Sequence, residues 1–144
     1  MSTEENKALV RRFYEEVVSK KNLATIDDFI DPNQVDHFAP PGTPRGIEGA
    51  RQLIGMLLTA FPDLQSTVED MIAEGDKVAA RLTVRGTHQG EFMSIPPTSK
   101  HVAITAIDIF RIAGGKIVER WGEGDMLGLM QQLGVIPTPE HAGR

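Results

Sequence analysis

The sequence predicts an α+β fold in which helices cover one face of a curved antiparallel sheet. Two observations support this: apolar residues recur at helical spacing in the first part of the chain, and they alternate with polar residues in the second part, which is rich in Val, Ile and Thr. Helices followed by a meander of strands are typical of α+β proteins. A curved sheet has a concave side, so we expect a cone-shaped cup that encloses one small apolar pocket.

The first half of the chain contains the predicted helices. Ser2 and Glu5 have the spacing of a capping box, which begins the first helix, and Pro32 prevents the second helix from continuing far. Three prolines then interrupt the backbone hydrogen bonding of the following segment. We therefore predict helices over 2–19, 22–30 and 46–61, a short strand over 34–38 and an irregular loop over 40–44.

The second half contains the predicted sheet. Gly75 and Gly114 lie in short turns between period-two runs, which indicates antiparallel hairpins. Gly134 stops the last helix. The expected elements are strands over 64–73, 77–88, 101–112 and 116–122, a long connection over 89–100, a helix over 125–133 and a flexible tail from about 137. At 144 residues, the whole chain (1–144) is expected to form a single domain.

The composition argues against several classes of function. With a net charge of −5 and a pI near 5.3, the chain lacks the basic surface that nucleic acid binding requires. It has no cysteine and no paired-histidine or glycine-rich phosphate motif, so we expect neither a metal site nor a phosphate-binding loop. The N-terminus is acidic and polar, unlike a signal peptide, and no apolar run approaches about 18 residues. We predict a cytoplasmic protein without a nucleic acid or membrane partner.

Asp108 places a carboxylate on an apolar strand face, in register with the inward residues of strand 101–112. A buried carboxylate can act as an acid/base that shares a proton with a substrate. It can equally be a structural group that is satisfied by backbone amides or by an arginine such as Arg81 or Arg120. The sequence leaves both interpretations open.

Three further polar residues are candidates. Asp125 opens the last helix, where Asp is a preferred N-cap, and a cap and a catalytic role do not exclude each other. His37 precedes the Pro-rich loop, and two interpretations are open. It has a chemical role, as a donor to a developing oxyanion or as a proton relay, or it has a structural role at the end of its strand. His88 has the same strand parity as the apolar residues Val78, Ala80, Leu82 and Val84. This predicts that its side chain faces the mouth of the pocket.

Five motifs are spread along the chain: AFPDL at 60–64, GTHQGEF at 86–92, IPPT at 95–98, GKIVERW at 115–121 and DMLGLMQQLG at 125–134. On these motifs the chain resembles, over nearly its whole length, the SnoaL-like polyketide cyclases (ester cyclases) of the NTF2-like superfamily. The chain departs from the family pattern at two positions. Arg120 stands where members often have His, and Ser99 stands where Gly commonly follows Pro-Pro-Thr.

The resemblance implies an NTF2-like cone and a cofactor-independent intramolecular aldol cyclisation of an apolar polyketide-type ester, or a related enolisation. The family's acid/base Asp matches Asp125, and His37 and Asp108 match polar positions that line the family's pocket. The substrate is thus expected to be a small apolar molecule with a carbonyl group. We expect it to contact Phe13, Tyr14, Leu57, His88, Phe92, Phe110 and Trp121.

Two alternatives remain open at this stage. The first is a non-catalytic module that binds a small lipophilic ligand, for which the methionines would provide an adaptable pocket. The second is epoxide hydrolysis, which requires Asp108 and Asp125 to meet over one site together with a positioning arginine. The outer face of the sheet also carries apolar residues such as Ile107 and Ile109, so we expect at least a homodimer.

Overall fold

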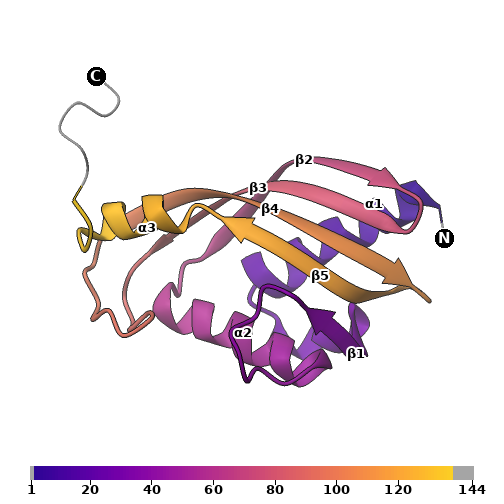
Figure 1. The fold of residues 1–144 in the computed structure, drawn as a ribbon, viewed down its shortest axis with the longest axis horizontal. Helices are drawn as coiled ribbons and strands as arrows, with labels where there is room; N and C mark the ends of the chain where they lie inside the picture. Colours follow the sequence, from indigo (N-terminus) through magenta and orange to yellow (C-terminus); the bar gives the residue numbers. More distant parts are fainter. Residues whose placement is uncertain (1, 138–144) are drawn as a thin grey trace.

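The computed structural model describes residues 2–137 and confirms the α+β fold (Figure 1). Its five strands form one sheet in the order β1-β5-β4-β3-β2, and only β1 pairs in parallel with its neighbour. The elements are α1 (Thr3–Phe13), the π-helical η1 (Tyr14–Ser19), the 3₁₀-helical η2 (Leu23–Asp28), β1 (Ile30–Asp36), α2 (Gly46–Ala60), β2 (Gln65–Glu74), β3 (Lys77–Thr87), β4 (His101–Ala113), β5 (Lys116–Gly124) and α3 (Met126–Leu133).

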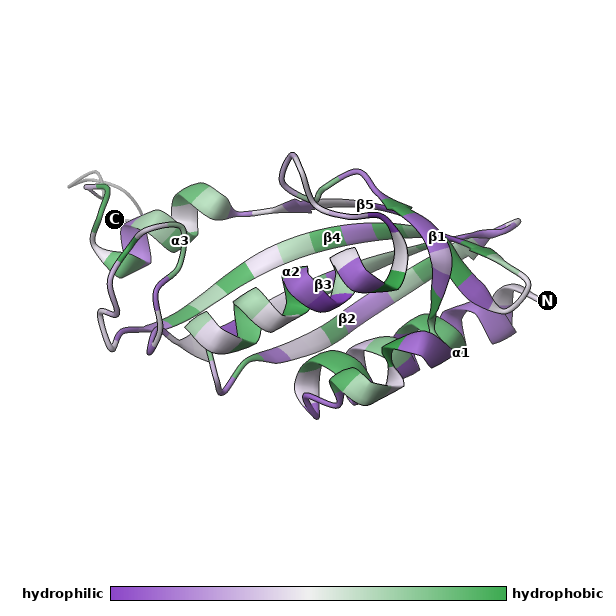
Figure 2. Ribbon diagram, turned by 90° about the horizontal axis from the view of Figure 1, so that it is seen from below, coloured by the Kyte–Doolittle hydropathy of each residue, from purple (hydrophilic) through white to green (hydrophobic). Residues whose placement is uncertain are grey.

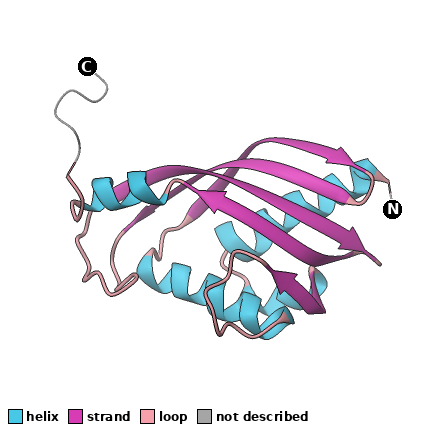
Figure 3. Ribbon diagram, in the orientation of Figure 1, coloured by secondary structure: helices cyan, strands magenta, loops and turns pink. Residues whose placement is uncertain are grey.

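The helices and the sheet make a cup (Figures 1 and 3). Figure 2 views the sheet from the side on which α1 and α2 lie across it, and α3 extends from one end of β5. The tail predicted from about residue 137 lies almost entirely outside the described residues. None of the helices in residues 2–137 has the length and apolar character needed to cross a membrane.

The first predicted helix changes its winding half-way. The capping box is confirmed, because Ser2 N–H donates to Glu5 Oε1 over 2.9 Å and Glu5 N–H donates to Ser2 Oγ over 3.1 Å. From Tyr14 onward the backbone is π-helical, and a π turn contains more residues than an α turn. Phe13 and Tyr14, which stand at the junction of the two windings, are both buried.

A β-bulge in β5 determines which of its side chains enter the cup. Ile112 pairs with Ile117, whereas Arg111 pairs with Glu119, so Val118 is an extra residue on β5. One extra residue exchanges the two faces for all the residues that follow it. Arg120 is consequently paired with Phe110 and faces the concave side.

β1 is longer than predicted, and the second predicted helix is shorter. β1 begins at Ile30, which pairs with Ile117, and it ends at Asp36, which pairs with Arg120. Only the 3₁₀ segment Leu23–Asp28 remains helical. Parallel pairing with β5 extends β1 at the expense of the predicted helix. Because β5 lies about 85 residues further along the chain, local sequence patterns do not reveal this pairing.

Candidate functional site

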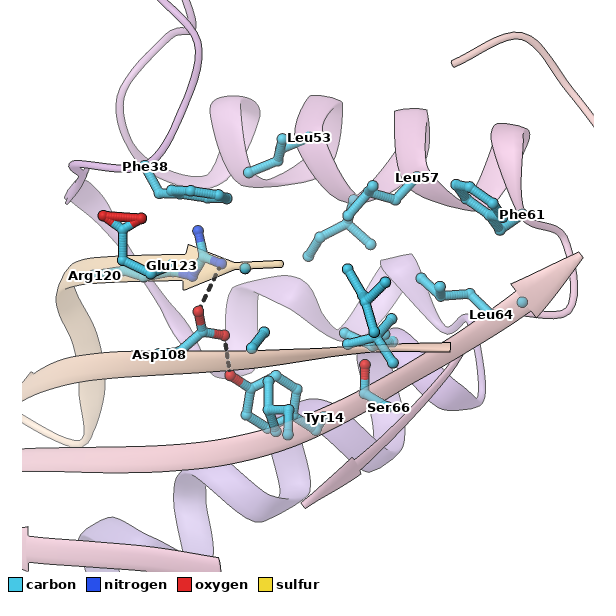
Figure 4. Close-up of a pocket in the computed structure, with 18 of the residues that line it drawn as sticks. Tyr14, Phe38, Leu53, Leu57, Phe61, Leu64, Ser66, Asp108, Arg120 and Glu123 are labelled. Atoms are coloured by element: carbon cyan, nitrogen blue, oxygen red, sulfur yellow. Dashed lines mark hydrogen bonds and ion pairs between the residues drawn. The ribbon is translucent and has the colours of Figure 1, made fainter. Parts of the chain in front are cut away.

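A cavity of about 200 Å³ lies between the concave face of the sheet and the helices (Figure 4). Its walls are mostly apolar, with Leu53 and Leu57 on α2 and Leu82 on β3 among the lining residues. Five of the seven residues predicted to contact a substrate line this cavity, namely Phe13, Tyr14, Leu57, Phe92 and Phe110. A concave apolar site with few polar groups is the usual form of a small-molecule site.

Some of the polar groups that line the cavity form a hydrogen-bonded cluster around Asp108. Tyr14 O–H donates to Asp108 Oδ2, and Arg120 Nη2 donates to Asp108 Oδ1 over 3.1 Å. Arg120 Nη1 also donates to both oxygens of Asp36, over 3.1 and 3.0 Å. All four residues line the cavity, and the side chains of Asp108, Asp36 and Arg120 are 7%, 15% and 18% exposed.

This cluster joins four separate elements of the fold. Asp108 and Arg120 come from the neighbouring strands β4 and β5, Tyr14 comes from the π-helical turn, and Asp36 ends β1. The guanidinium of Arg120 also lies 5.4 Å from the ring centroid of Phe38, at the start of the Pro-rich loop. A cation over an aromatic face is attracted by the ring quadrupole. Arg120 is therefore held from several sides.

Burial and charge shift the acid–base behaviour of the cluster. Burial, followed by the charge of Asp108 and its hydrogen bond, raises the pKa of Tyr14 well above the ordinary 10.0. Burial alone lowers the pKa of Arg120, but the carboxylates of Asp108 and Asp36 outweigh it and raise that pKa overall. Tyr14 thus stays a neutral hydrogen-bond donor and Arg120 stays a cation. The cavity therefore holds two carboxylates, Asp36 and Asp108, beside two hydrogen-bond donors, Tyr14 and Arg120.

Both the sequence and the fold of this chain are similar to those of known proteins. The family model for SnoaL-like polyketide cyclase matches residues 8–133. The chain belongs to this family. It is 30% identical to nogalonic acid methyl ester cyclase of Streptomyces nogalater, over 81% of this chain and 84% of that protein. It is also 30% identical to aklanonic acid methyl ester cyclase DnrD of Streptomyces peucetius, over 92% of this chain and 93% of that protein.

A solved structure supports the same assignment. The structure of TsrD from Streptomyces laurentii has a TM-score of 0.87 to this chain and 31% sequence identity, and the match covers 94% of this chain and 99% of TsrD. The expected NTF2-like architecture of the SnoaL-like family is therefore shown for this chain. Several of the site residues predicted from the sequence nevertheless lie elsewhere.

Asp125, which the resemblance led us to expect as the acid/base, is the N-cap of α3. Its Oδ1 accepts the Gly128 N–H over 2.9 Å, as expected for a cap. The residue is exposed and does not line the apolar cavity; it borders a shallow groove on the other face of the sheet with Arg81 and Ile107. The structure brings Asp108 into the cavity and leaves Asp125 outside it.

His37 and Trp121 lie together on the outer face of the sheet. Their rings stack at 5.0 Å with 9° between the planes, and His37 Nε2 lies 2.7 Å from Glu119 Oε2. The prediction that Trp121 lines the cavity is wrong because of the bulge at Val118, which turns Trp121 outward and Arg120 inward. His37 lies in the turn directly after β1, where its N–H donates to Arg120 O over 2.8 Å.

His88, which was predicted to end a strand at the pocket mouth, lies directly after β3. It is fully buried, where we expected it at the pocket mouth, and it does not line the cavity. Its ring lies 5.5 Å from that of Phe61, which does line the cavity. Nδ1 accepts the Thr98 N–H over 3.2 Å, so His88 anchors the connection after β3 to the core.

Sequence reasoning missed Asp36 as a site residue and considered Arg120 only as a counter-ion for Asp108. Asp36 has no signal of its own, because its role depends on parallel pairing with β5. For Arg120 a weak signal exists, since it replaces the family's usual histidine. Among residues 2–137, no three or more His, Asp or Glu side chains come together in a group that could hold a metal ion.

Proposed function

We propose that this chain catalyses a cofactor-independent aldol cyclisation, or a related enolisation, of an apolar polyketide-type ester, with Asp108 as the acid/base. The observation that carries the proposal is a buried carboxylate at the polar end of an apolar cavity, in contact with Tyr14 and Arg120. Membership of the SnoaL-like family and the ester cyclases among its relatives support the class of reaction.

The proposed reaction needs only the groups that are present. Asp108 removes a proton from a carbon between two carbonyl groups, and the electrons of the C–H bond pass into an enolate. The enolate carbon attacks a ketone of the same molecule, which forms the new C–C bond and leaves an alkoxide. The alkoxide takes the proton back from Asp108, so the carboxylate is restored and no oxidant, reductant or metal is consumed.

Tyr14 and Arg120 supply the donors for the oxygen on which negative charge develops. When Asp108 takes the substrate proton, it loses its charge, and the Tyr14 O–H and the Arg120 N–H that pointed at it can turn to the enolate oxygen. Removal of one donor to a developing oxyanion typically costs about 10²–10³-fold in rate. The apolar walls exclude water from the enolate and strengthen these interactions.

A second candidate function, epoxide hydrolysis, is favoured by one specific observation. A single guanidinium bridges two carboxylates, because Arg120 contacts both Asp36 and Asp108. One carboxylate can remove a proton from water while the other, when protonated, donates to the epoxide oxygen. The sequence analysis paired Asp108 with Asp125 for this role, whereas we propose Asp36, which contacts the same guanidinium and lines the cavity.

The experiment compares two aspartates that the structure separates. We would assay ring closure and solvent deuterium incorporation with aklanonic and nogalonic acid methyl esters, for the wild type, Asp108→Asn and Asp125→Asn. Removing a general base costs about 10²–10⁴-fold in rate. We expect this loss for Asp108→Asn and less than a threefold change for Asp125→Asn, because Asn is also a good N-cap.

The other outcomes assign the function differently. A large loss for Asp125→Asn with an active Asp108→Asn would return the acid/base role to Asp125. Binding of both esters without turnover or deuterium exchange, insensitive to either substitution, would favour a ligand-binding module. Incorporation of ¹⁸O from labelled water into an epoxide probe would favour hydrolysis.

A further inference from the structure

Gly122 lies directly across from Asp108 in the pairing of β4 and β5. We propose that Gly122 is a positioning residue, whose missing side chain is what allows Arg120 to bridge Asp36 and Asp108. The structural part of this inference stands on the contacts alone. Its catalytic consequence rests on the proposed function of Asp108.

The geometry leaves no room for a side chain at this position. A Cβ on Gly122 would lie 2.6 Å from Asp108 Oδ1 and 3.1 Å from Arg120 Nη2. Real Cβ atoms essentially never approach another heavy atom within 3.0 Å. The space over Gly122 is therefore the space in which the carboxylate and the guanidinium meet.

The backbone does not explain this glycine. Gly122 is absent from the glycines of residues 2–137 that have positive φ, so its conformation is open to other residues. Glycine within a strand is also unfavourable, since it adds backbone entropy to the unfolded chain and packs no side chain. A steric requirement of the cluster accounts for a residue that the strand itself disfavours.

Neither partner can move away without losing a contact. Asp108 is a short side chain that is held by Tyr14 on its other oxygen. Arg120 is long and keeps two contacts with Asp36. An alanine at 122 is thus expected to separate Arg120 from Asp108 and to leave Arg120 on Asp36. Gly122→Ala would then remove one ion pair without changing any charge.

Gly124→Ala provides a matched control. Gly124 lies two residues further along the same face of β5, and a Cβ there meets only Ala106 Cβ at 3.8 Å and Thr105 O at 4.0 Å. These are ordinary van der Waals contacts. The two variants make the same chemical change, one with and one without the predicted clash.

The first test is structural and independent of activity. In crystal structures, the distance between Arg120 Nη2 and Asp108 Oδ1 should exceed 3.5 Å in Gly122→Ala and stay within hydrogen-bond range in Gly124→Ala. Overpacking should lower the Tm of Gly122→Ala by at least about 3 °C. The same substitution made in an Asp108→Ala background should leave Tm unchanged or raise it, because the clashing oxygen is gone. If Gly122→Ala is too unstable to crystallise, this comparison of Tm values in the two backgrounds still tests the clash.

The second test is kinetic. We expect Gly122→Ala to lower kcat by at least about 10-fold with little change in KM, since the contact acts on the developing charge. An intact Arg120 to Asp108 contact in Gly122→Ala, or equal Tm losses in both backgrounds, would overturn the inference. If no variant of the chain turns over either ester, the proposed function fails, while the distances and the Tm cycle still decide the role of Gly122.

Discussion

Replacing Asp108 by asparagine should change the ionisation of Tyr14, and the chain offers an unusually clean way to measure it. Tyr14 is the only tyrosine of the sequence, so phenolate absorbance during an alkaline titration reports this residue alone. Burial, the charge of Asp108 and the hydrogen bond to Asp108 all raise the pKa of Tyr14 in the wild type. The substitution removes the second and third causes and leaves the first.

We therefore expect the pKa of Tyr14 to fall in Asp108→Asn but to remain above 10.0, because the ring is still buried. The side chain of Asn keeps the shape of the site. Its single oxygen can accept from Arg120, while its amide group can donate to the hydroxyl oxygen of Tyr14. The fold should persist, at a cost of about 1–3 kcal/mol for the weakened contacts of Arg120.

The same shift predicts how stability depends on pH. The pKa of Tyr14 is higher in the folded than in the unfolded chain, so its stabilising contribution is complete below pH 10 and is lost as the pH rises toward the folded pKa. Each pH unit in that interval removes about 1.4 kcal/mol from the free energy of unfolding. In Asp108→Asn this loss should level off at a lower pH than in the wild type.

Urea unfolding at a series of alkaline pH values, followed by the fluorescence of the single tryptophan, measures this dependence beside the absorbance titration. Asp125→Asn is the control, because Asp125 does not contact Tyr14 and should leave both curves unchanged. A wild-type Tyr14 that titrates near 10, or an unchanged titration in Asp108→Asn, would refute the contact between Tyr14 and Asp108 on which the proposed site depends.

Two further predictions concern the outer face of the sheet. His37→Phe should preserve the stack on Trp121 and change ester turnover less than threefold, because His37 lies outside the cavity. A loss of turnover above about 100-fold, the scale of a general acid/base, would place His37 in the reaction. We also expect a homodimer through the apolar row that crosses β2, β3, β4 and β5 at Ile72, Ala79, Ile109 and Trp121, in which Ile72 is 74% and Ile109 is 38% exposed. Ile109→Lys should then give monomers in analytical ultracentrifugation, with the exposed Met93→Lys as control, and an unchanged mass would exclude this face as the interface.

The order of the elements and the inward place of Asp108 follow from the sequence alone. The alternation on strand 101–112 puts Asp108 among apolar neighbours, and β4 keeps this register without interruption up to Phe110. The capping box at Ser2 and the cap at Asp125 are also local, since each depends on residues three positions apart. Features set by neighbouring residues could therefore be predicted.

The partners of Asp108 were decided by the tertiary structure. Straight alternation from Ile117 would have put Trp121 in the cup, but the bulge at Val118 places Arg120 there, and a single extra residue leaves no mark in the pattern of apolar positions. Asp36 reaches Arg120 only because β1 pairs in parallel with β5, across more than 80 residues of chain. The register of paired strands depends on the sum of many contacts between residues that are distant in the sequence. The sequence therefore predicts the buried carboxylate of Asp108, and only the tertiary structure shows that Arg120 contacts it.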